Sequence, residues 1–165
     1  MKVLVLSDSH AGLSFMRCCI EKVKPGCVIH LGDYFDDGKV LAEEYPHIPF
    51  HQVPGNCDRY RCPPWQAEIL CYPIGGVKLL MTHGHKHAVK TGTQRLLEDA
   101  RDRGVQAVLY GHTHRAECYC EPDGLWVLNP GSCGSYSGSV GVMELENGKI
   151  SACYILSQTE ISQLF

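Results

Sequence analysis

The chain has 165 residues, of which 44% are hydrophobic and 20% are charged, and its formal net charge is −3. These proportions are typical of one compact globular domain, so we expect a single domain over residues 1–165. No apolar run approaches the roughly 18 residues that a membrane-spanning helix needs. We therefore expect no membrane as partner. A protein that binds a nucleic-acid backbone is usually basic, so the net charge of −3 leads us to expect no nucleic-acid polymer as partner either.

The first elements predict a parallel sheet. Lys2–Ser7 is an apolar run typical of a buried strand, and apolar residues at helical spacing follow it until Pro25 and Gly26. Cys27–Leu31 is a second buried strand, which completes a βαβ unit. Further elements are expected in this order: a weaker helix at Lys39–Glu44, a strand at Phe50–Val53, a loop at Pro54–Pro64, a strand at Val77–Met81, a helix at Thr93–Arg103, a strand at Ala107–Tyr110 and a glycine-rich loop at Gly131–Ser139.

Three two-residue turns predict antiparallel hairpins in the second half of the chain. They are Gly75-Gly76, Asp123-Gly124 and Asn147-Gly148, each between apolar runs. The fold class is therefore α/β with both parallel and antiparallel pairing.

Ten cysteines are present, which raises the question of a disulfide framework. The apolar start of the chain is followed at once by Asp8 and His10, and no small-residue cleavage site is present. Without a secretory signal we expect a cytoplasmic protein whose cysteines stay free thiols and serve mostly as small core side chains.

Polar, metal-capable residues follow five apolar strands directly. The five segments are VLVLSDSH, VIHLGD, HQVPGNCD, KLLMTHGH and AVLYGHTH. Ligands of α/β proteins bind beyond the carboxyl ends of the strands, so these distant residues can converge at one edge. The side chains expected to meet there are Asp8, His10, Asp33, Asn56, His83, His112 and His114. Their oxygen and imidazole donors suit manganese, iron, cobalt, nickel or zinc, and not a thiolate-type site.

Each of these signals is weak alone, because a Gly-Asp pair can be a turn and a lone histidine is often structural. A purely structural explanation would have to produce the same pattern at five strand ends, with almost no basic residue among them. The joint pattern therefore favours a metal site.

The motifs D-x-H, G-D, G-N-x-D, T-H-G-H and G-H-T-H, in this order from Asp8 to His114, resemble the calcineurin-like metallophosphoesterase superfamily. Residues 129–132, Asn-Pro-Gly-Ser, resemble a further element of its short single-domain phosphodiesterase branch of bacteria and archaea. The resemblance implies a four-layer α/β/β/α sandwich of two mixed sheets flanked by helices. It also implies two divalent ions, for which we expect Mn²⁺ with Ni²⁺, Co²⁺, Fe²⁺ or Zn²⁺ as alternatives, and it leaves homo-oligomers open.

The resemblance implies a role for each ligand. Asp8, His10 and His114 would hold the first ion, Asn56, His83 and His112 the second, and Asp33 would bridge the two and position a hydroxide. Two cations roughly 3.5–4 Å apart can clamp the attacking and leaving oxygens of an in-line displacement. The implied reaction is hydrolysis of a small phosphate ester, most simply a diester, by a hydroxide that both ions share.

The chain departs from the wider family at Cys57, where that family often has a histidine that protonates the leaving group. A thiol is a poor acid for an alkoxide, so activated diesters should be favoured unless another group donates the proton. His85 is the first residue to test, although a histidine that orients a neighbour or faces solvent fits equally well. Asp58 is expected to orient a ligand by accepting a hydrogen bond. Arg59 and Arg61 either steer a phosphate or lie on a solvated loop.

Two other functions stay open. The same fold serves as a non-catalytic protein-interaction scaffold in a retromer subunit, which resembles this chain in length and in its G-H-T-H and N-P-G-S elements. That scaffold lacks part of the carboxylate set, whereas Asp8, Asp33 and Asn56 are all present here. A nuclease is the third reading, and the negative net charge and the lack of room for a DNA-binding domain disfavour it.

Overall fold

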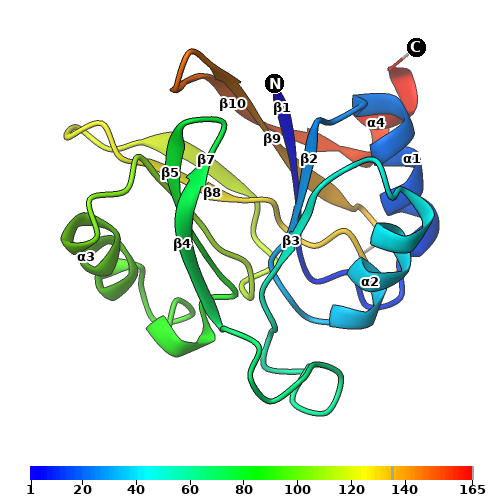
Figure 1. Ribbon diagram of the computed structural model, residues 1–165, viewed down its shortest axis with the longest axis horizontal. Coiled ribbons are helices and arrows are strands. Elements are labelled where there is room, and N and C mark those ends of the chain that lie inside the picture. The colour runs from blue at the N-terminus through cyan, green and yellow to red at the C-terminus, as the bar shows by residue number, and fades with distance from the viewer. Residues whose placement is uncertain (135, 165) are drawn as a thin grey trace.

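The computed structural model describes residues 1–134 and 136–164, and its strands form two five-stranded sheets (Figure 1). The first sheet has the order β10-β9-β1-β2-β3 and the second the order β4-β5-β6-β8-β7. The strands are β1 (Lys2–Leu6), β2 (Cys27–His30), β3 (Phe50–Gln52), β4 (Ile69–Ile74), β5 (Val77–Thr82), β6 (Ala107–Leu109), β7 (Glu117–Cys120), β8 (Trp126–Asn129), β9 (Ser139–Glu146) and β10 (Lys149–Ser157). The helices are α1 (Leu13–Val23), α2 (Phe35–Glu44), α3 (Gln94–Asp102), α4 (Gln158–Gln163) and the 3-10 helix η1 (His85–His87).

The sheets pack face to face and helices cover their outer faces (Figure 1). Apolar side chains of α1, α2 and α4 pack on the first sheet, and those of α3 pack on the second. The predicted four-layer α/β/β/α sandwich of two mixed sheets is thus confirmed. No helix among residues 1–134 and 136–164 is long and apolar enough to cross a membrane.

Strand β1 shows why the first sheet is buried on both faces. Val3 and Val5 point into the core between the sheets, whereas Leu4 and Leu6 point toward the helices. All four side chains are 0% exposed, so this strand is a continuous apolar run without the alternation of a half-exposed strand.

Parallel pairing brings the strand ends to one edge. β1, β2 and β3 are parallel neighbours in the first sheet, and β5, β6 and β8 are parallel neighbours in the second. The carboxyl ends of these parallel strands lie at the edge of the molecule away from the N-terminus. The long β3–β4 connection lies at the same edge (Figure 1). The antiparallel pairs β4–β5, β7–β8 and β9–β10 turn at the predicted glycine dipeptides.

Two helices differ from the prediction. Helix α2 begins at Phe35, one turn before Lys39. Asp36 and Asp37 in its first turn stabilise that end of the helix electrostatically. Helix α4 was not predicted, although a capping box starts it. Ser157 Oγ accepts a hydrogen bond from the Glu160 amide, and the Glu160 carboxylate accepts one from the Ser157 amide.

Candidate metal centre

The seven predicted ligands all lie just beyond strand ends at the shared edge. Asp8 and His10 follow β1, Asp33 follows β2, Asn56 follows β3, His83 follows β5, and His112 and His114 follow β6. The carboxylate and amide oxygens therefore come from the first sheet, and most of the imidazoles come from the second. Both sheets must be in place before the donors can meet.

The first group of donors consists of Asp8, His10 and His114, whose ligand atoms all lie within 4.8 Å of one another. Asp8 Oδ1 is 2.9 Å from His114 Nε2, and the rings of His10 and His114 are 5.4 Å apart between centroids. The carboxylate is buried, whereas both histidines are exposed. This half of the centre is therefore open to an incoming ligand.

The second group consists of Asp8, Asp33 and His83, all buried. His83 Nε2 lies 3.6 Å from Asp33 Oδ2 and 4.0 Å from Asp8 Oδ1. Asn56 Oδ1 is 3.1 Å from the same nitrogen, and the His112 ring is 5.0 Å from the His83 ring between centroids. Asp8 belongs to both groups, whereas the family resemblance gives the shared position to Asp33.

One oxygen of Asp8 accepts no hydrogen bond from the residues that the structure describes. Oδ2 accepts hydrogen bonds from Ser7 Oγ at 2.6 Å and from the His112 amide at 3.1 Å. Oδ1 is buried, and no group that the structure describes donates a hydrogen bond to it, although His114 Nε2 lies nearby. A buried carboxylate oxygen without a partner is costly. A cation between Asp8 and His114 would satisfy it, so this donor set fits a metal ion.

The surroundings of His83 also fit a metal ion. Its Nδ1 is 2.7 Å from the Leu31 carbonyl oxygen, which can only accept, so Nδ1 carries a proton. In the neutral ring Nε2 is then a lone pair, yet it faces Asn56 Oδ1, another acceptor, at 3.1 Å. A second proton on the ring or a metal ion at Nε2 would resolve this contact, and the neighbouring donors Asp8 and Asp33 fit the metal ion. A backbone carbonyl behind the ring is also the usual partner of a metal-ligating histidine.

The backbone at five of the seven ligands is left-handed. The φ angles are 53° at Asp8, 42° at His10, 56° at Asp33, 70° at His112 and 59° at His114. Such conformations cost about 1–3 kcal/mol each in residues other than glycine, and they concentrate at functional sites. The surrounding hydrogen bonds must therefore hold these loops in place.

Asp58 provides part of that support. It is 0% exposed, and its carboxylate accepts hydrogen bonds from the Phe35 amide at 2.8 Å and the Gly55 amide at 2.7 Å. The Gly55 amide belongs to the loop that carries Asn56, and Phe35 begins helix α2 directly after the loop that carries Asp33. Asp58 thus joins two ligand loops through their backbones and offers no ligand atom of its own.

A buried network that the sequence analysis missed holds the loop after β1. Ser9 Oγ donates to Asp37 Oδ2 at 2.6 Å and lies 3.1 Å from His30 Nε2, and the Ala11 amide donates to Asp37 Oδ2 at 2.9 Å. Asp37 lies on α2, so this helix fixes the loop that carries His10. Burial lowers the pKa of His30, which keeps that ring neutral in the network.

Asn129, the first residue of the Asn-Pro-Gly-Ser element, has a structural role. Its Nδ2 donates to the Gly111 carbonyl at 3.2 Å and to Thr113 Oγ1 at 2.9 Å, and its Oδ1 accepts from the Gly131 amide at 3.0 Å. The end of β8 thereby fixes the Gly-His-Thr-His loop that carries His112.

The protonation states suit metal binding. Burial and the neighbouring His83 lower the pKa of His112 to about 4, so its ring is neutral at neutral pH. Burial alone would raise the pKa of Asp33, but His83 and the hydrogen bond from the Cys57 amide outweigh it and lower the pKa. A neutral imidazole and an ionised carboxylate are the forms that bind metal ions.

Cys57 and His85 lie beside this centre. Burial and the Asp33 carboxylate raise the pKa of the Cys57 thiol, so it stays protonated at neutral pH. The clearest contact of this residue is its amide, which donates to Asp33 Oδ1 at 2.9 Å. The His85 ring lies 5.5 Å from His83 and 6.2 Å from His112 between centroids, and burial lowers its pKa. All ten cysteines are free thiols.

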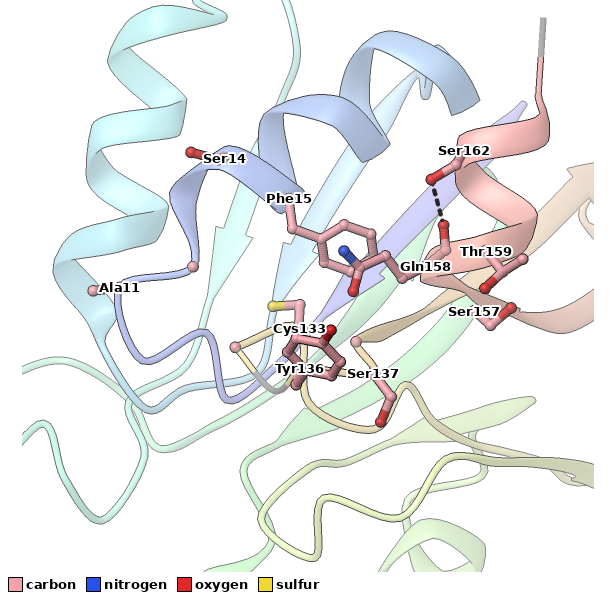
Figure 2. Close-up of a pocket in the computed structure, with 13 residues that line it drawn as sticks. Ala11, Ser14, Phe15, Cys133, Tyr136, Ser137, Ser157, Gln158, Thr159 and Ser162 are labelled. Carbon is pink, nitrogen blue, oxygen red and sulfur yellow. Dashed lines mark hydrogen bonds between the residues drawn. The ribbon is translucent and has the colours of Figure 1, made fainter.

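Two hollows lie near the ligand loops. One of them, shown in Figure 2, lies between the start of α1, residues 133, 134 and 136–138, and the start of α4. Its volume is about 790 Å³. Phe15, Tyr136 and Gln158 line it, and its described lining includes no acid, lysine, arginine or histidine. It is therefore a poor match for an anionic substrate. The other, of about 760 Å³, lies beside Asn56 and carries cationic side chains.

Comparison with known proteins supports one family. Residues 1–148 match the calcineurin-like phosphoesterase superfamily domain. A phosphodiesterase of Methanocaldococcus jannaschii is 30% identical over 164 residues, which covers 88% of this chain and 94% of that protein. A crystal structure of a predicted phosphoesterase from Streptococcus pneumoniae is 25% identical, with a TM-score of 0.77 and coverage of 96% and 90% of the two chains. Zinc-bound Vps29 from Entamoeba histolytica has the same fold at 22% identity, with a TM-score of 0.70 and coverage of 96% and 99%. The chain therefore belongs to the calcineurin-like phosphoesterase superfamily.

Proposed function

We propose that this protein is a metal-dependent phosphodiesterase that holds two divalent ions, preferably Mn²⁺, and hydrolyses a small phosphate ester. The observation that carries the proposal is the buried Asp8 Oδ1, which accepts no hydrogen bond from the described residues and faces His114 Nε2 at 2.9 Å. The residues assigned to the ions are Asp8, His10, Asp33, Asn56, His83, His112 and His114.

The chain itself supplies position and charge. When bound, two divalent ions provide Lewis-acid charge and a water of lowered pKa, which suits attack on a phosphate ester at neutral pH. Asp33 is assigned the position between the ions, and its Oδ1 is oriented by the Cys57 amide. Asp58 keeps Asn56 in place through the Gly55 amide. Such preorganised donors need no rearrangement during the reaction.

The first test is activity with defined metals. Protein freed of metal and reconstituted with Mn²⁺, Ni²⁺ or Co²⁺ is expected to hydrolyse bis-p-nitrophenyl phosphate, and Asp33→Ala should lose about a thousandfold in kcat/KM, equivalent to about 4 kcal/mol. Metal content measured by mass spectrometry should approach two ions per chain in the wild type and fall in the variant. Wild-type protein that cleaves neither this diester nor p-nitrophenyl phosphate above the Asp33→Ala blank would overturn the proposal.

Hydrolysis measured beside metal content separates the scaffold alternative. Solved Vps29 structures share the fold at identities below 25%, which speaks for the fold alone, and one of them holds zinc. A scaffold should therefore show no hydrolysis above the Asp33→Ala blank even when Mn²⁺ is bound. The complete set of oxygen and imidazole donors favours the enzyme.

We also propose His85 as the proton donor for poor leaving groups. Its effect should depend on the leaving group, which a matched pair tests: the phenyl and p-nitrophenyl esters of thymidine 5′-monophosphate. His85→Gln should lose about a hundredfold in kcat/KM on the phenyl ester and much less on the p-nitrophenyl ester, whose leaving group needs no proton.

The pH dependence of hydrolysis of the same two esters is a second test of His85. Because burial lowers the pKa of His85, its protonated form becomes more populated as the pH falls. The difference between wild type and His85→Gln on the phenyl ester should therefore widen toward lower pH. Equal losses on both esters at every pH would assign His85 a positioning role.

A further inference from the structure

A hollow of about 760 Å³ opens directly beside the candidate metal centre. Asn56 and His85 form the side that faces the centre, and the β3–β4 connection forms the rest together with Lys86. Its volume lies within the range of small-molecule sites. A ligand whose phosphate reaches the metal ligands would therefore extend its organic part into this hollow.

The hollow has an apolar wall and a charged rim. Pro54, Pro63 and Pro64 supply flat apolar surface. Arg59, Lys86 and Glu68 supply two positive charges and one negative charge. The lining thus carries an excess of one positive charge beside a rigid apolar face, which suits an organic group that bears an anion.

Of the two cations in the hollow, only one has no charged partner among the residues that the structure describes. Lys86 Nζ lies 3.3 Å from Glu68 Oε2, so its charge is already paired. Arg59 has neither an ion pair nor a side-chain hydrogen bond with any residue in the described part of the chain, and its guanidinium lies only against the Tyr60 ring, at 5.6 Å. The Arg59 side chain is therefore the group in the hollow that remains available to an anionic ligand.

Arg61 lies only two residues further along and is engaged elsewhere. Its guanidinium stacks on the Tyr34 ring at 4.3 Å, and Nη1 lies 3.8 Å from Asp36 Oδ2. Arg61 is not among the residues that line the hollow. The two arginines of this loop, alike in sequence, therefore have different surroundings.

We propose that the hollow receives the organic part of the substrate and that Arg59 binds a second phosphate group carried on it. The substrate class is thus a phosphodiester with a further phosphate, of the size of a nucleotide. An arginine suits this role because its planar guanidinium can pair with phosphate through two parallel hydrogen bonds. The proposal rests on the proposed phosphodiesterase function, because that function places the scissile phosphate at the metal ligands.

The test uses three dinucleotides as competitors of bis-p-nitrophenyl phosphate hydrolysis with Mn²⁺. They are thymidylyl-thymidine without a terminal phosphate, with a 5′-terminal phosphate and with a 3′-terminal phosphate. Inhibition constants report binding whether or not the dinucleotide is cleaved. We expect one phosphorylated form to bind the wild type about tenfold or more tightly than the unphosphorylated form, as for a charge-assisted hydrogen-bonded pair.

Matched variants show whether Arg59 causes that preference, measured as the ratio of the inhibition constants of the unphosphorylated and phosphorylated dinucleotides. Arg59→Gln should reduce this ratio to about twofold or less, and Arg59→Lys should retain part of it. Arg61→Gln should keep the wild-type ratio although it loses the same charge. A terminal phosphate that bound the metal ions directly would give a preference that survives in Arg59→Gln. That result, an equal loss in both glutamine variants, or no preference in the wild type would each overturn the assignment.

The outcome is separable from that of the proposed function. If wild-type protein does not hydrolyse bis-p-nitrophenyl phosphate at all, the phosphodiesterase proposal fails and the present one fails with it. If hydrolysis occurs but the ratio does not depend on Arg59, only the second-phosphate proposal fails.

Discussion

Asp8→Asn should stabilise the metal-free protein while it abolishes the response to metal. The asparagine oxygen can keep the hydrogen bonds from Ser7 and His112. The substitution also removes a buried oxygen that accepts no hydrogen bond from the described residues. Relief of that penalty should raise the free energy of unfolding by about 1–3 kcal/mol in EDTA. An amide nitrogen at this position also cannot share a cation with His114, so metal binding should fail.

Urea unfolding with and without Mn²⁺ measures both effects. A metal present at about a thousand times its dissociation constant stabilises the folded state by about 4 kcal/mol, and this increment should be nearly lost in Asp8→Asn, together with about a thousandfold in kcat/KM. Asp99→Asn is the control, because Asp99 pairs with His87 and Arg103 away from the centre. It should lose similar stability with and without metal. An Asp8→Asn protein that is destabilised in EDTA yet responds to Mn²⁺ like the wild type would contradict a metal role for Asp8.

Gly111→Ala should damage both the fold and the site, although Gly111 has no left-handed backbone. A Cβ atom there would lie 2.0 Å from Ser7 Oγ and 2.8 Å from Asp8 Oδ2. Ser7 cannot simply rotate away, because its hydroxyl holds the Asp8 carboxylate. We expect a loss of about 1–3 kcal/mol in the free energy of unfolding and about a hundredfold loss in kcat/KM, because a ligand displaced by about 1 Å is enough for that.

A double-mutant cycle tests the cause. Ser7→Ala removes the hydroxyl that the new methyl group would meet, so the stability loss in Ser7→Ala/Gly111→Ala should be smaller than the sum of the two single losses. Gly26→Ala is the control, because a Cβ atom there would approach the flexible Met1 side chain at 2.9 Å and would meet the Lys2 carbonyl oxygen only at 3.9 Å, an ordinary contact distance. Strict additivity in the cycle, or an equal cost at Gly26, would show that the contact with Ser7 does not limit this position.

Much of the fold and of the donor set could be predicted from the sequence, for a specific physical reason. A strand buried on both faces is a continuous apolar run, so the first polar residue after Leu6 or Leu109 marks the sheet edge. Parallel order then brings those residues to one edge. The hairpins were predictable because Gly75-Gly76 and similar pairs allow the left-handed backbone that such turns need.

The support of the site could not be predicted in the same way. Asp37 lies in a run of acids at the start of a helix, which reads as an exposed first turn, yet tertiary packing buries it against Ser9. Arg59 and Arg61 are the same residue type on the same loop, so the sequence does not distinguish them. Only the three-dimensional path of the loop places Arg59 at the hollow and Arg61 against Tyr34. Helix α4, in contrast, could have been predicted from the sequence, because Ser157 and Glu160 have the spacing of a capping box.

The division of donors between the sheets has a mechanical consequence. Each group of metal-capable residues combines side chains from both sheets, so cations there would cross-link the two sheets at this edge. They would hold the two sheets together at this edge without any change in the apolar core. Chelation should then loosen this edge first, and amide hydrogens of the loops after β1, β2, β5 and β6 should exchange with solvent faster while those of the central strands remain protected.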